Sequence, residues 1–143
     1  MLAERYFSII RISIDQEQKT LPSLKDSEWY DIYEFANRQA ILGVVFDGVK
    51  VLGKIGKKPP LDLLFKWIAS VEQIRGQNAR LNRRSVEVLQ ELCSAGYECC
   101  LLKGQGNAIM YSNPFVRQCG DIDVLLRNAN RNLVSSYVKY KKK

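Results

Sequence analysis

The sequence contains no histidine, and this absence removes several common kinds of catalytic site. Serine and cysteine enzymes with a histidine base are excluded, and so are metal centres with imidazole ligands. No apolar run approaches the roughly 18 residues that are needed to cross a bilayer. The N-terminal stretch MLAERYFSIIRISIDQ carries charges between short apolar pieces, unlike a secretory signal. We therefore expect a cytoplasmic protein without a membrane partner.

Cysteine is scarce, and the spacing of the four cysteines does not indicate a zinc site. They stand at irregular intervals: Cys93, Cys99, Cys100 and Cys119. A structural zinc site with four cysteines usually shows two C-x-x-C pairs. Reduced and mostly buried thiols are therefore expected.

Basic residues are in excess, and the excess lies mainly in the last third of the chain. The net charge is +7, and residues 93–143 hold 8 Lys and Arg against 3 Asp and Glu. Lys139 and the three lysines at 141–143 form a terminal tail. Such a tail can bind nucleic acid or phosphates, although a solvated helix end is the favoured interpretation.

Apolar residues recur at helical spacing through the first two thirds of the chain. The predicted helices cover residues 26–42, 43–52 and 61–92, with a possible bend at Gly76. The last helix carries four arginines on its outer face: Arg75, Arg80, Arg83 and Arg84. They could face a phosphate backbone, but a solvated helix face is the more common meaning of such a run.

After Gly96 the pattern changes to short strands and turns. The expected elements are a strand at 97–102, a glycine turn at 103–107, a short helical piece at 107–112, a strand at 121–126 and a final helix through Leu133 and Val138. The predicted fold class is therefore α+β. A helical region over 1–92 precedes a partial α/β core over 93–143, built on a small mixed sheet.

Asp121 and Asp123 are the first candidate site. In a strand they project from one face, while Ile122 and Val124 project from the other. Two carboxylates so placed repel each other, and a divalent ion between them removes the repulsion. Carboxylate oxygens suit Mg²⁺ or Mn²⁺, which can bridge to phosphate oxygens. The D-x-D pattern alone is weak support, because many chains contain it.

The glycine turn upstream is the second candidate site. Lys103 offers a cation, and the backbone amides at Gly104 and Gln105 can face a phosphate. Arg117 can add a phosphate contact or pair with Asp121 when no metal is bound. The glycine turn and the two aspartates together could hold a triphosphate. The alternative is an ordinary turn with a local salt bridge, and spacing alone leaves both readings open.

Residues 101–126, LLKGQGNAIMYSNPFVRQCGDIDVLL, resemble the signature of an uncharacterised nucleotidyltransferase family in the DNA polymerase β-like superfamily. The matching positions are Leu102-Lys103-Gly104, Tyr111, Pro114, Arg117 and Gly120-Asp121-Ile122-Asp123. The resemblance implies that the two aspartates are catalytic metal ligands. It also implies that the Lys103-Gly104 turn stands where the superfamily binds phosphate.

The sequence departs from the superfamily pattern at two points. Gln105 occupies the position of a phosphate-binding serine, and no Asp or Glu follows Asp123 to serve as the third carboxylate. Three explanations are open: a fragment of a longer enzyme, a third acid from Glu98 or from a partner chain, or a non-catalytic relative. A short sheet with an exposed edge favours a missing segment or a homo-oligomer.

The function that we expect is metal-dependent transfer of NMP from an NTP to a hydroxyl acceptor, on a small molecule, a protein or RNA. The alternative is a non-catalytic basic module that binds nucleic acid or a partner through its arginines and lysines. A sugar-nucleotide glycosyltransferase also uses D-x-D. That reading is disfavoured because the residues before the motif look helical rather than βα-repeated.

Overall fold

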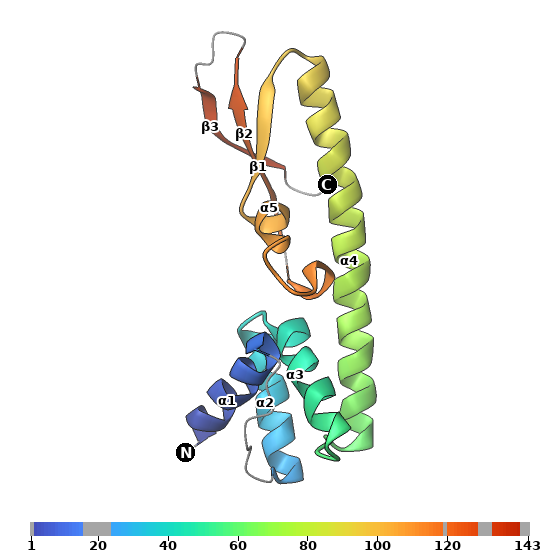
Figure 1. The fold of residues 1–143 in the computed structure, drawn as a ribbon. Helices are drawn as coiled ribbons and strands as arrows, with labels where there is room; N and C mark the ends of the chain where they lie inside the picture. The colour runs from blue at the N-terminus through green and yellow to red at the C-terminus, as the bar shows by residue number, and fades with distance from the viewer. Residues whose placement is uncertain (1, 16–23, 119, 129–132, 141–143) are drawn as a thin grey trace. The chain divides into compact units, whose positions relative to one another are not determined.

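The computed structural model describes residues 2–15, 24–118, 120–128 and 133–140 (Figure 1). Helices come first and a three-stranded antiparallel sheet follows, which confirms the predicted α+β class with a helical N-terminal part. The elements are α1 (Leu2–Asp15), α2 (Asp26–Arg38), α3 (Leu42–Lys54), α4 (Leu61–Ser94), β1 (Glu98–Leu102), α5 (Gly104–Ala108), the 3₁₀ turn η1 (Pro114–Val116), β2 (Ile122–Arg127) and β3 (Leu133–Tyr140). None of the helices in these ranges is long and apolar enough to cross a membrane.

The chain forms two compact units, each described by itself. Unit 1 comprises Met1–Arg75 and Val116–Gln118, and unit 2 comprises Gly76–Phe115 and Cys119–Lys143. The predicted long helix is confirmed, because α4 runs for 34 residues without interruption. Its first half belongs to unit 1 and its second half to unit 2. The domain boundary that the sequence suggests at residue 92 stays a prediction.

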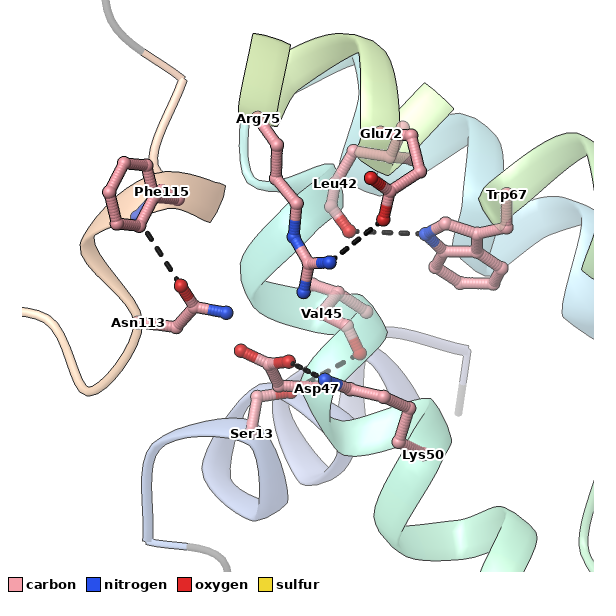
Figure 2. A network of polar contacts seen from close by, with 10 residues as sticks. All are labelled: Ser13, Leu42, Val45, Asp47, Lys50, Trp67, Glu72, Arg75, Asn113 and Phe115. Carbon is pink, nitrogen blue, oxygen red and sulfur yellow. Dashed lines mark hydrogen bonds and ion pairs between the residues drawn. The ribbon is translucent and has the colours of Figure 1, made fainter. Parts of the chain in front are cut away.

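Unit 1 is built around Trp67, which is fully buried. The indole Nε1 donates a hydrogen bond of 3.1 Å to the carbonyl oxygen of Leu42 (Figure 2). Tyr33 meets the indole edge-on, with ring centroids 5.2 Å apart, and Phe46 lies at 5.9 Å. On α1, the hydroxyl of Ser13 donates to the carbonyl of Ile9 at 2.8 Å and lies 3.4 Å from the carbonyl oxygen of Val45 on α3. These contacts join α1, α2, α3 and the first half of α4 in one apolar core.

The predicted end of the helix over 26–42 is wrong by several residues. The helix α2 ends at Arg38, because Ala40 adopts a positive φ of 55° and reverses the chain. The amide of Ile41 returns to the carbonyl of Ala36 at 3.0 Å and closes the turn. The next helix, α3, begins at Leu42 and includes Gly43.

The sheet of unit 2 packs one face against the second half of α4. Ile122, Val124 and Leu126 of β2 are buried together with Val88 of α4. The strands follow the order β1-β2-β3 and are antiparallel throughout, so the expectation of a mixed sheet is wrong. Alternate apolar residues along β2 face the core, as the sequence predicted.

The predicted final helix is wrong, because residues 133–140 form β3. Apolar residues at positions 133, 134, 137 and 138 fit a helical period, but valine and tyrosine also favour strands. The segment pairs with the edge of β2 and therefore forms a strand and not a helix. Lys139 lies opposite Asp123 in the register, not at a solvated helix end. The lysines at 141–143 and Cys119 lie outside the described residues.

Candidate functional site

Asp121 and Asp123 lie at the beginning of β2. Asp123 stands opposite Leu102, the last residue of β1, in the antiparallel register. Its side chain is half-buried, whereas Ile122 and Val124 are buried against α4. Asp121 comes just before the strand and is half-buried as well. Since alternate residues of an extended chain share a face, both carboxylates belong to the sheet face that points away from α4.

The turn at Lys103 and Gly104 lies against the same end of the sheet. It follows β1 directly, one residue after the partner of Asp123. A β-carbon added to Gly104 would lie 2.9 Å from the carbonyl oxygen of Asp121, closer than packed atoms allow. The backbones at 104 and 121 are therefore in contact. A side chain at position 104 would separate the turn from the acid pair.

Lys103 has an unusual backbone conformation, with φ 49° and ψ −140°. Residues other than glycine rarely adopt a positive φ, and such conformations cluster at functional sites. The carbonyl of Lys103 accepts a hydrogen bond of 2.7 Å from the amide of Asn107. This bond closes α5, so the glycine turn predicted at 103–107 is mostly a short helix. The predicted helical piece at 107–112 correspondingly begins and ends earlier.

Replacing Gly106 with alanine is expected to displace α5 from β1. The added β-carbon would lie 2.8 Å from the carbonyl oxygen of Leu101, and a backbone atom cannot rotate away. Overpacking of this kind costs about 1–3 kcal/mol of unfolding free energy. Urea unfolding followed by circular dichroism measures the loss.

Alanine at Gly76 is the matched control for this substitution. Gly76 is also helical and belongs to the same unit, but an added β-carbon would meet only the end of a flexible arginine at 3.8 Å. Equal stability of the two variants would contradict the close contact of α5 with β1.

The side chain of Gln105 is buried within unit 2. The side chain is 9% exposed, and its Nε2 donates a hydrogen bond to Oδ1 of Asn82 on α4. Its Oε1 is buried and accepts no hydrogen bond from the residues that the structure describes. Asn82 is not among the site residues predicted from the sequence. A signal was present, because Asn78, Asn82 and Ser85 recur at helical spacing beside the apolar stripe of α4.

Replacing Asn82 with alanine is expected to cost about 1–3 kcal/mol of unfolding free energy, because the buried amide of Gln105 loses its acceptor. Urea unfolding measures the change. Gln90→Ala, at an exposed position of the same helix, should change stability by no more than about 0.5 kcal/mol. Adding Gln105→Leu to Asn82→Ala should restore part of the loss, since no polar group is then left unpaired. A loss no larger in Asn82→Ala than in the Gln90 control would refute this role.

Arg117 belongs to unit 1, whereas the aspartates belong to unit 2. Its neighbour Val116 is buried in the core of unit 1. Its other neighbour, Gln118, accepts a hydrogen bond of 3.1 Å from the amide of Leu42 through Oε1. These contacts hold the backbone of Arg117 in unit 1. Its expected role toward phosphate stays a prediction.

Glu98 lies at the far end of β1 from the acid pair. It stands opposite Arg127, whereas Asp123 stands opposite Leu102, four residues along β1. A strand rises about 3.3 Å per residue, so about 13 Å of strand separates the two positions. Carboxylates that share one Mg²⁺ bind it at about 2 Å. Glu98 is therefore not the third ligand, and the hypothesis that Glu98 supplies the missing acid is wrong.

Two of the four arginines on α4 are paired with acids of the same helix. Arg75 lies 2.8 Å from Glu72, and Arg84 lies 2.9 Å from Glu87 and 3.4 Å from Glu91. Pairs at this spacing are ordinary stabilising contacts of an exposed helix. Half of the predicted basic face is thus neutralised by neighbouring carboxylates.

Within the described ranges, no group of three or more His, Cys, Asp or Glu side chains could hold a metal ion. The two aspartates at the start of β2 thus supply only part of the ligands that a metal ion needs. The donor set still fits a divalent ion, because Mg²⁺ is usually bound by one or two carboxylates together with substrate phosphates.

Comparison with known proteins gives a family match. A model of a family described as uncharacterised nucleotidyltransferase matches residues 25–139, a range that includes Lys103, Asp121 and Asp123. No curated protein and no solved structure matches the chain. The family match extends over most of the sequence. The chain belongs to the uncharacterised nucleotidyltransferase family.

Proposed function

We propose that the protein transfers a nucleoside monophosphate from an NTP to a hydroxyl group of an acceptor, with Mg²⁺ or Mn²⁺ as cofactor. The observation that carries the proposal is the contact between the backbone of Gly104 and the carbonyl oxygen of Asp121. This contact joins the cationic turn and the carboxylate pair at one end of the sheet. A triphosphate and its metal need both kinds of group at one place.

Asp121 and Asp123 are the proposed metal ligands. Both are half-buried, and the alternating apolar residues of β2 fix the strand that carries them against α4. A bound divalent ion would neutralise charge on the phosphates and orient the phosphoryl group for in-line attack. The two carboxylates alone would repel a triphosphate, so nucleotide binding at this end of the sheet should depend on the metal.

Lys103 and the backbone of the turn are the proposed phosphate contacts. Lys103 is exposed and supplies positive charge beside Gly104. Gln105 contributes through its backbone amide, because its side chain is engaged with Asn82. These groups would hold the β- and γ-phosphates and leave the α-phosphorus open to the acceptor.

In the proposed reaction, the acceptor hydroxyl oxygen forms a bond to the α-phosphorus. The bond from the α-phosphorus to the bridging oxygen breaks, and pyrophosphate leaves with the electron pair. The hydroxyl proton passes to a base. Glu98 lies at the far end of β1 and is not placed to serve as this base.

Transfer of labelled nucleotide tests this proposal. The chain is incubated with Mg²⁺, a cell extract and an NTP labelled either on the α-phosphate or on the γ-phosphate. The proposal expects the α-label to appear on an acceptor and the γ-label to leave as pyrophosphate. Treatment of the labelled acceptor with protease or ribonuclease then identifies its class. Incorporation of the γ-label above that in the same extract without the chain would indicate a kinase and overturn the proposal.

A further inference from the structure

Cys93 and Cys99 lie side by side in unit 2, and their sulfur atoms are 3.1 Å apart. Cys93 stands near the end of α4 and is exposed, while Cys99 is in β1 and is half-buried. The expectation of mostly buried thiols is therefore wrong for the described cysteines, since Cys100 is exposed as well. Two thiols in contact, one of them exposed to solvent, are the groups that thiol–disulfide exchange requires.

The fold between α4 and β1 explains why these two thiols meet. The chain turns back after Ser94, and the amide of Tyr97 bonds to the carbonyl of Leu92 at 3.1 Å. In the register, Cys99 pairs with Leu126, whose side chain is buried on the sheet face toward α4. Cys100 pairs with Leu125 and takes the opposite face. Cys99, and not Cys100, is therefore on the sheet face toward α4, and it lies next to Cys93.

The environments of the two sulfurs differ. The thiol of Cys99 donates a weak hydrogen bond of 3.7 Å to the carbonyl of Leu89, and burial raises the pKa of Cys99 to about 11. Thiolates, not thiols, attack disulfides. Cys93 is therefore the thiol that meets an external disulfide first, and Cys99 is positioned behind it. A covalent bond between them needs the sulfurs to approach from 3.1 Å to about 2.05 Å, within reach of a small side-chain rotation.

We propose that Cys93 and Cys99 form a dithiol–disulfide exchange site that is oxidised by low-molecular-weight disulfides of the glutathione type. The Cys93 thiolate attacks one sulfur of glutathione disulfide, whose S–S bond breaks and releases one glutathione thiolate. The Cys99 sulfur then loses its proton to solvent, attacks the Cys93 sulfur and releases the second glutathione. Two protein thiols are oxidised, and one glutathione disulfide is reduced to two thiols. This site is independent of the proposed nucleotide transfer.

Peptide mapping of the oxidised full chain tests the proposal. The reduced protein is treated with glutathione disulfide, remaining thiols are alkylated, and trypsin is combined with a glutamate-specific protease. Cleavage after Glu91, Glu98 and Lys103 separates residues 92–98, with Cys93, from residues 99–103, with Cys99 and Cys100. The proposal expects these two peptides to be joined through Cys99 and to separate after reduction with dithiothreitol.

Serine variants distinguish the two steps. Cys99→Ser should keep one glutathione on Cys93 and lose the joined peptides completely. Cys100→Ser, the matched control, should still form the joined peptides. Cys93→Ser should slow oxidation of Cys99 at least about tenfold, because the remaining thiol is half-buried and protonated.

The mapping of the unsubstituted chain decides the proposal even if a variant does not fold. Joined peptides linked through Cys99 support it. Glutathione that stays on Cys93 while Cys99 remains open to alkylation would overturn it. A bond from Cys93 to Cys100 in the unsubstituted chain would overturn it as well.

Discussion

Replacing Asp123 with asparagine is expected to lower the Mg²⁺-dependent affinity for NTP by about 100-fold. Asparagine keeps the size of the side chain but removes the negative charge that would bind the ion. A 100-fold loss equals about 2.7 kcal/mol, within the range for removing one partner of a close charge pair. Asp121→Asn should have an effect of similar size. Isothermal titration with a non-hydrolysable NTP analogue, with and without Mg²⁺, measures both variants.

Two further variants are compared with Asp123→Asn. Asp31→Asn, at an exposed position of α2, changes the net charge equally and should leave the affinity unchanged. Lys103→Met should weaken binding with Mg²⁺ and also without it, because a phosphate cation acts whether or not the metal is present. Circular dichroism verifies that each variant is folded. If Asp123→Asn binds NTP as tightly as the unsubstituted chain, the acid pair is not the metal site.

Replacing Trp67 with alanine is expected to destabilise unit 1 by about 3–5 kcal/mol. The indole is fully buried, and the change leaves a large cavity beside Tyr33 and Phe46. It also removes the hydrogen bond to the carbonyl of Leu42, which is then buried without its donor. Since a small protein is stable by only about 5–15 kcal/mol, the variant should unfold at much lower urea. Circular dichroism follows the transition.

Phe65→Ala is the matched control for Trp67→Ala. Phe65 is on the same helix, and 62% of its surface is exposed. Its truncation should change the unfolding free energy by no more than about 0.5 kcal/mol, as is usual for surface positions. Similar losses in the two variants would contradict the central position of Trp67 in the core.

The features that sequence reasoning predicted correctly are those in which one periodicity extends over many residues. Apolar spacing from Leu61 onward predicted the long helix α4, which the structure confirms. Ile122, Val124 and Leu126, each two residues apart, predicted a strand with one buried face, because a shift of one residue would expose all three side chains.

The predictions failed where tertiary contacts decide between local alternatives. Residues 133–140 fit a helical period, but the unpaired edge of β2 makes them a strand. Residues 104–108 contain two glycines and read as a turn, yet contacts with Leu101 and Asp121 support a short helix. The contact of Gln105 with Asn82 joins positions 23 residues apart. Sequence spacing alone does not indicate such a pair.

The most direct test of the proposed nucleotide site is anomalous X-ray diffraction from crystals grown with Mn²⁺ and a non-hydrolysable NTP analogue. Our account predicts an anomalous peak between the carboxylates of Asp121 and Asp123. It also predicts triphosphate density along the turn at Lys103 and Gly104. A metal and triphosphate bound elsewhere on the chain, or a nucleotide at the turn with no metal at the aspartates, would contradict it.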